Sequence, residues 1–202
     1  MICRLVCMKI YLITGMFLLI AVQIKAQFQS DYSVRELKSG AFVNDKTYIY
    51  SLPFQKGKKI FLIQAYESKM SHRGEYALDF KVKEGTAIHA ARDGKVIAVR
   101  SDSDKGGLKP DNLSDGNFIS ILHEDGSVAH YWHLKKGGVV VKEGEEVLKN
   151  QLIGYSGNTG YSAFPHLHFE VVQNGKQVPT RFYTQKGIRY LRPGRYHKNP
   201  LM

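Results

Sequence analysis

Cysteine is almost absent from this chain, and what there is lies at one end. The two cysteines, Cys3 and Cys7, both fall within the first 26 residues, so residues 27–202 contain none. This part of the chain therefore has no disulfide, no thiolate metal ligand and no cysteine nucleophile. Two further protease signatures, HExxH and GxSxG, are also missing from the sequence.

No apolar run in the sequence is long enough for a comfortable membrane span. Ile10–Val22 is the longest, at about 13 residues, whereas a spanning helix needs about 20. Arg4 and Lys9 precede this run and Ala26 closes it, which predicts a signal peptide over 1–26. Met8 is an alternative start, and a retained membrane anchor is the alternative interpretation. The signal predicts export to the periplasm or cell envelope, or secretion, with membrane contact only through the signal.

Acidic residues are too few to balance the basic ones. The chain has 29 Lys and Arg against 18 Asp and Glu, and segment 1–26 holds three of the basic residues and no acidic one. Residues 27–202 thus keep a net charge of about +8, which favours polyanionic partners. No RNA-binding, helix-turn-helix or zinc-finger pattern is present, so nucleic acid is not expected, and export favours the anionic polymers of a bacterial wall.

A convincing helical period is also missing, and short apolar runs separated by Gly, Asn and Asp predict strands throughout. We expect an all-β fold: a single antiparallel β-sheet or sandwich domain with an open groove, walled in part by the polar loop 101–117. The expected segments are an N-terminal β extension (27–70), a main domain (71–183) and a basic, solvated C-terminal tail (184–202). Two related stretches, VKEGTAI at 82–88 and VKEGEEV at 141–147, each predict a strand, a glycine turn and a strand.

The stretch FPHLHFEV, at 164–171, places two histidines two residues apart. In a strand, His166, His168 and Glu170 share one face, and Leu167, Phe169 and Val171 share the other. The apolar face suits a core. The histidine face is either a solvated polar surface or part of a zinc site.

Three motifs in order over 71–170 resemble the lysostaphin/LytM family of zinc metallopeptidases, which cut peptide bonds in peptidoglycan. They are HRGEYALDFKVKEGTAIHAARDGKV from His72, YWHL from Tyr131, and GYSGNTGYSAFPHLHFEV from Gly154. The resemblance implies that His72, Asp79 and His168 hold zinc and leave a fourth position for water. It further implies that His166 is the base that takes the proton of that water and that His133 stabilises the oxyanion.

One spacing departs from the family pattern. The family usually places the first histidine and the aspartate as HxxxD, whereas His72 and Asp79 are seven residues apart, with Tyr76 in the usual aspartate position. Asp79 keeps its distance from the following EGT, so the extra residues predict a bulge between the two ligands. Glu75 remains open as a substitute ligand.

Three functions are compatible with these features. The first is an exported, monomeric zinc endopeptidase that acts on the stem peptides of peptidoglycan. The second is a catalytically inactive relative that binds peptidoglycan or activates a wall amidase. The third is a biotinyl- or lipoyl-type carrier, which the VKEG repeats resemble, although the acceptor lysine is missing. His130 lies an odd number of residues from His133, and a regular strand predicts that it faces away from His133.

Overall fold

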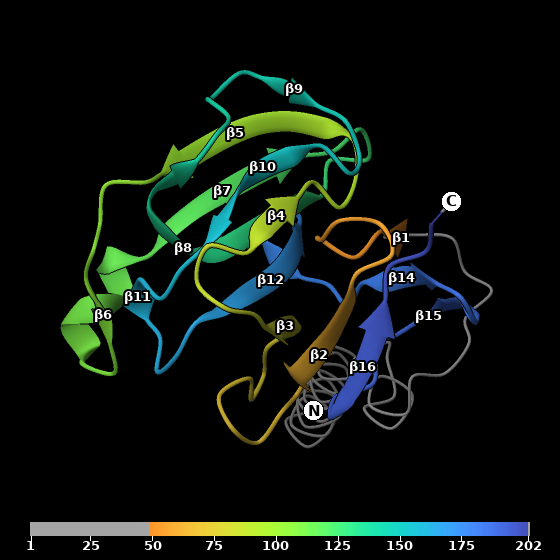
Figure 1. Cartoon of the computed structure of the whole chain (residues 1–202), viewed down its shortest axis with the longest axis horizontal. Coiled ribbons are helices and arrows are strands. Elements are labelled where there is room, and N and C mark those ends of the chain that lie inside the picture. The colour runs from red at the N-terminus through yellow and green to blue at the C-terminus, as the bar shows by residue number, and fades with distance from the viewer. Residues whose placement is uncertain (1–48, 202) are drawn as a thin grey trace, which may run out of the picture. The chain divides into compact units, whose positions relative to one another are not determined.

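The computed structural model describes residues 49–201 and confirms the all-β prediction (Figure 1). Within this range the regular elements are short to medium strands and a 3-10 helix, Pro110–Asp115. The strands are β1 (Ile49–Tyr50), β2 (Lys59–Gln64), β3 (Ala77–Lys81), β4 (Ala87–His89), β5 (Gly94–Arg100), β6 (Gly106–Gly107), β7 (Asn117–Leu122), β8 (Val128–Val139), β9 (Glu146–Val147), β10 (Leu152–Ser156), β11 (Gly160–Tyr161), β12 (His166–Gln173), β13 (Lys176–Gln177), β14 (Arg181–Thr184), β15 (Gly187–Arg189) and β16 (Arg195–Lys198).

Most strands belong to one large antiparallel sheet. Its main path runs β16-β2-β3-β12-β8-β7-β5-β9, and β10, β4 and β13 pair onto it. A three-stranded sheet, β1-β14-β15, and a small parallel pair, β6 with β11, complete the described part. Strands far apart in sequence are thereby made neighbours: β3 and β8 flank β12, and these three strands carry most of the sequence-predicted site residues.

Residue alternation in β12 separates the core from the site. Leu167, Phe169 and Val171 are fully buried, as the period of two predicts. Phe169 lies at the centre of an aromatic cluster, with ring centroids 5.2 Å from Tyr131, 5.9 Å from Tyr50 and 6.0 Å from Phe182. The core therefore joins the large sheet to β1 and β14 of the three-stranded sheet.

Both VKEG stretches form the same glycine turn. Gly85 and Gly144 have φ angles of 77° and 85°, which glycine adopts without steric cost. In the first turn the N–H of Thr86 donates to the carbonyl of Lys83 at 3.2 Å. In the second the N–H of Glu145 donates to the carbonyl of Lys142 at 3.1 Å. A short strand, β4 or β9, follows each turn.

The C-terminal segment is part of the fold, and the expectation of a solvated tail was wrong for its strands. β15 pairs with β14, and β16 pairs with β2 in antiparallel register from Arg195 opposite Leu62 to Lys198 opposite Lys59. The polar side chains of β16 misled the prediction, because backbone hydrogen bonding incorporates an edge strand whatever its exposed side chains are. β2, from the expected N-terminal extension, pairs with β3 in the same sheet.

The predicted signal peptide at 1–26 lies outside the described residues. No helix within residues 49–201 has the length and apolar character required of a membrane-spanning segment.

The aromatic core yields a stability prediction. Phe169→Ala should lower the free energy of unfolding by about 3–5 kcal/mol, because it removes a fully buried ring and leaves a cavity. Phe164→Ala is the matched control, since Phe164 is 43% exposed, and it should cost about 1 kcal/mol or less. Urea unfolding followed by circular dichroism measures both. Equal losses for the two variants would contradict the assignment of Phe169 to the core.

Candidate metal centre

Three side chains converge where β3 meets β12. His72 precedes β3, Asp79 lies within it, and His168 lies opposite Asp79 in the β3–β12 register. One ligand atom from each residue can be chosen so that all three atoms lie within 4.8 Å of one another. His72 and Asp79 are buried and His168 is partly buried. The fold thus brings together the three residues predicted to hold a metal.

The extra residues between His72 and Asp79 form a turn. The N–H of Glu75 donates to the carbonyl of His72 at 3.1 Å, and Gly74 has a φ of 75°. The chain then enters β3 at Ala77, so Asp79 returns to the side of His72. Glu75 is partly exposed and lies outside the three-residue group.

Hydrogen bonds indicate where the protons of this group lie. The Nδ1–H of His72 donates to the carbonyl of Ala77 at 3.1 Å. The Nε2 of the neutral ring is then a lone pair, and it faces Oδ2 of Asp79 at 3.3 Å. The Nδ1 of His168 lies 2.9 Å from Oδ1 of the same carboxylate. Two acceptors facing each other at 3.3 Å favour a positive charge, from a proton or a metal ion, between them.

The pKa directions of His72 and Asp79 also favour a positive charge between them. Burial lowers the pKa of His72, but the hydrogen bond and negative charge of Asp79 outweigh it and raise the pKa overall. Burial raises the pKa of Asp79, but the hydrogen bonds from His168 and His72 outweigh it and hold the pKa far below its usual value. Two imidazole nitrogens and a carboxylate oxygen are donors that zinc and similar divalent ions accept. The group therefore fits a metal ion.

His133 and His166 lie beside this group. Their ring centroids are 4.6 Å apart, and that of His133 is 5.8 Å from that of His168. The Nδ1–H of His133 donates to the carbonyl of Thr159 at 2.7 Å, and the Nδ1–H of His166 donates to the carbonyl of Phe164 at 2.8 Å. Each neutral ring thus keeps Nε2 as a proton acceptor. The Nε2 of His166 lies 3.7 Å from Oδ1 of Asp79.

Burial keeps both of these histidines neutral at neutral pH. Burial, followed by the charges of His166 and His168, lowers the pKa of His133 to about 3. Burial likewise lowers the pKa of His166, although the charge of Asp79 opposes the shift. The site therefore presents two uncharged imidazoles next to His72, Asp79 and His168.

An unusual backbone conformation places His133 at the site. Its φ is 63°, in the left-handed region that non-glycine residues rarely adopt. Alternation along β8 is interrupted there: Trp132 and His133 are both partly exposed, between buried Tyr131 and Leu134. His130 pairs with Glu170 and Trp132 with His168, so His130 and Trp132 share the face of His168. The expectation that His130 faces away from His133 assumed a regular strand, and the left-handed conformation at His133 breaks that alternation.

One residue of the centre, Gln64, was not predicted from the sequence. Gln64, at the end of β2, is 5% exposed, and its Nε2 donates to Oδ2 of Asp79 and to Oγ of Ser71, the latter at 2.6 Å. The same nitrogen lies 3.2 Å from Nε2 of His72, and Oε1 is buried without a partner among the described residues. No motif marks this glutamine; only the β2–β3 pairing, with a bulge that sets Gln64 opposite Asp79, brings it in.

The polar loop 101–117 borders the segment that precedes β12. Its strand β6 pairs in parallel with β11, with Gly106 opposite Gly160. Asn117 is fully buried, and its side chain donates to the carbonyls of Ser103 and Leu134. The loop is thus fixed against the GNTGYS part of the third motif.

Comparison with known proteins assigns the chain to a family. The sequence model of the family described as Peptidase family M23 matches residues 73–180, which is just over half of the chain. The chain therefore belongs to peptidase family M23, a family of metallopeptidases, and the resemblance to lysostaphin-type enzymes is confirmed. The match begins one residue after His72 and includes Asp79, His133, His166 and His168.

Two curated relatives illustrate the likeness. The glycyl-glycine endopeptidase ALE-1 of Staphylococcus capitis is 32% identical over 142 residues, which is 70% of this chain and 36% of the relative. The peptidoglycan DD-endopeptidase ShyA of Vibrio cholerae is 35% identical over 100 residues, which is 50% of this chain and 20% of the relative. The chain spans about a fifth to a third of the length of such relatives.

Among solved structures, the M23 metalloprotease pseudoalterin, from the deep sea, shares the fold. Its TM-score is 0.51, and the two chains are 21% identical over 76% of this chain and 96% of that chain.

The contacts of Gln64 predict a role in metal affinity. Gln64→Leu keeps the side-chain volume but removes the N–H that orients Asp79, and it should weaken divalent-metal binding by about 10–100-fold, as loss of such supporting hydrogen bonds does. Competition with a chromophoric chelator measures the affinity. Gln55→Leu, at an exposed position, is the control. Unchanged affinity in Gln64→Leu would show that the contact with Asp79 is not needed.

Proposed function

We propose that this chain is an exported zinc metalloendopeptidase that hydrolyses peptide cross-links of bacterial peptidoglycan. The observation that carries the proposal is the convergence of His72, Asp79 and His168, with the Nε2 acceptors of two further histidines beside them. The family assignment and the endopeptidase relatives support the same activity. Export rests on the signal-like sequence at 1–26.

In this proposal His72 and His168 supply imidazole nitrogens to zinc and Asp79 supplies a carboxylate oxygen. When bound, zinc would lower the pKa of a water from ~15.7 to about 7 and polarise a carbonyl. Gln64 and the Nδ1 hydrogen bond of His72 hold two of the ligands in place. The choice of zinc follows the donor set and the family resemblance.

His166 is assigned as the general base. Its Nδ1–H is fixed on the carbonyl of Phe164, so Nε2 is the atom that takes up a proton. Ser162 Oγ, 3.2 Å from the same Nδ1, helps to hold the ring. Its lowered pKa keeps Nε2 unprotonated at neutral pH, as a base requires.

His133 is assigned to the oxyanion of the tetrahedral intermediate. With Nδ1–H on Thr159, the neutral ring has no hydrogen at Nε2, so it donates from Nε2 only after taking up a proton. Its low pKa opposes this in the resting site. Negative charge developing on the substrate would favour uptake of a proton from solvent, and the protonated ring would then donate from Nε2 to the oxyanion. The substrates are stem peptides, and we expect the chain to act as a monomer in the periplasm or cell envelope, or as a secreted protein.

The ligand assignment can be tested by two carboxylate substitutions. Asp79→Asn should weaken zinc binding by more than the ~10–100-fold typical of supporting residues. Glu75→Gln should weaken it about fivefold or less, the effect of a screened and partly exposed charge. Chelator competition measures both variants. The reverse order would assign Glu75 as the ligand.

The activity itself can be tested on purified peptidoglycan, with released muropeptides followed by mass. The chain should convert cross-linked dimers to monomers, a chelator should stop this, and His166→Ala should slow it by about 10²–10⁴-fold. His89→Ala is a control at a histidine outside the site. A chain that binds the wall but cuts nothing after zinc is added would instead be a non-catalytic wall-binding or amidase-activating protein.

A further inference from the structure

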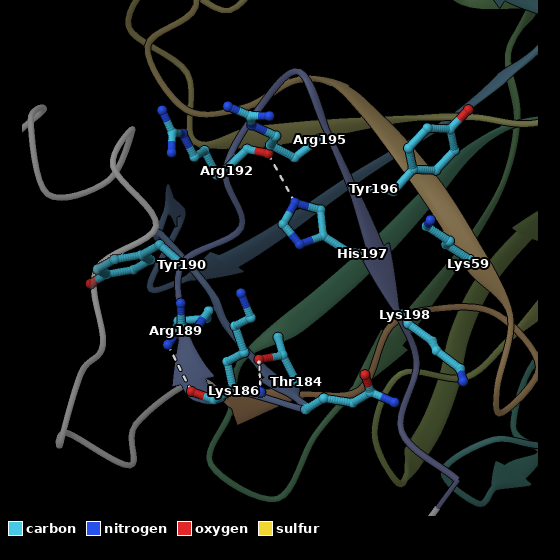
Figure 2. A pocket seen from close by; sticks show the side chains of 11 residues that line it. Lys59, Thr184, Lys186, Arg189, Tyr190, Arg192, Arg195, Tyr196, His197 and Lys198 are labelled. Carbon is cyan, nitrogen blue, oxygen red and sulfur yellow. Dashed lines mark hydrogen bonds between the residues drawn. The ribbon is translucent and has the colours of Figure 1, made fainter.

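A second candidate site is a cavity of about 640 Å³, whose lining residues are drawn in Figure 2. It is bordered by β16, the β14–β15 turn and the start of β2, and neither the five predicted residues of the metal centre nor Gln64 lines it. Its size falls in the range of ligand sites, about 300–1,000 Å³. The cavity is therefore large enough for part of a polymer chain, and it is separate from the proposed peptidase site.

The described residues that line this cavity carry charge of one sign. Six of the eleven are lysine or arginine, and none is aspartate or glutamate. Lys186, Arg192, Arg195 and Lys198 form no ion pair with the described residues, since the ion pairs of arginine and lysine lie elsewhere. Cations gathered around one hollow repel one another and attract anions.

Contacts among the described residues hold the backbone around the cavity, and these contacts do not use the guanidinium groups of Arg192 and Arg195. The Nε2–H of His197 donates to the carbonyl of Arg192 at 2.9 Å. Lys59 packs over the ring of Tyr196, at 4.9 Å. β16 itself is fixed by its pairing with β2. The guanidinium groups of Arg192 and Arg195 are thus presented by a fixed turn and strand edge.

We propose that this cavity binds a phosphate-bearing polymer. A polymer carries phosphate groups at several positions, which suits cations that line the cavity from separate segments: Lys186 from the β14–β15 turn, and Arg192, Arg195 and Lys198 from the β16 region. Arginine matches phosphate through its planar set of donors, and lysine adds a point charge. The exposed ring of Tyr196 (62%) offers an apolar face to the rest of the polymer. The site does not depend on peptidase activity.

The test uses the full chain and short inorganic polyphosphate, titrated by calorimetry at 0.15 M salt, on the order of physiological ionic strength. The double variant R192Q/R195Q should lose affinity about tenfold or more, because each hydrogen bond to a charged group contributes about tenfold or more. K83Q/K142Q is the matched control: it removes the same charge from exposed lysines outside the cavity, and it should change affinity about twofold or less. The wild type and both variants keep the same metal centre, so any binding of polyphosphate to metal held there is equal in all three proteins and does not affect their comparison. Equal thermal unfolding would show that both variants fold.

Three results would overturn the proposal. Absence of polyphosphate binding to the wild type would exclude a phosphate site. Equal losses in R192Q/R195Q and K83Q/K142Q would attribute binding to net charge alone. Poly-glutamate binding as tight as polyphosphate, with the same loss in R192Q/R195Q, would assign the cavity to acidic peptides. Wall hydrolysis by the R192Q/R195Q variant is a separate readout, so failure of either function is seen independently.

Discussion

The antiparallel pairing of β12 with β3 is the constraint on which the candidate site depends. Its register sets His168 opposite Asp79, and it also sets Phe169 opposite Leu78 on the other face. A slip of one residue would move both sets to the wrong face. The fully buried apolar residues prevent this slip, because they would be exposed by it. The geometry of the candidate metal site is therefore determined by the hydrophobic core behind it.

The second constraint is the buried charge of Asp79. An isolated carboxylate at 6% exposure would be costly to bury. Here one oxygen lies near His168 and His166, and the other near Gln64 and His72. Removing one of these partners leaves the charge undercompensated, which is why supporting residues such as Gln64 should matter for metal affinity. A divalent cation would offset the buried negative charge of Asp79 more fully than a proton does, because it carries two positive charges.

Much of this arrangement could be predicted from the sequence, because it rests on local period and on motifs. The alternation of HLHFEV gave the buried and polar faces of β12, and the motifs gave the five candidate residues. The remainder depends on contacts that no local pattern encodes. Gln64 reaches Asp79 only through a bulged strand pairing, and the left-handed φ of His133 interrupts the alternation on which the prediction for His130 relied. β16 was missed because exposed, basic side chains hide an edge strand.

β2 connects the two sites inferred for this protein. Gln64, at one end, contacts the metal-binding group, and Lys59, at the other, lines the basic cavity. Five residues of strand span about 17 Å, so a polymer held in the cavity would lie within a few stem-peptide lengths of the metal centre. Binding there would raise the local concentration of wall material near the site without contributing to the chemistry. Such an arrangement would lower the apparent KM for intact wall and leave the hydrolysis of small peptides unchanged.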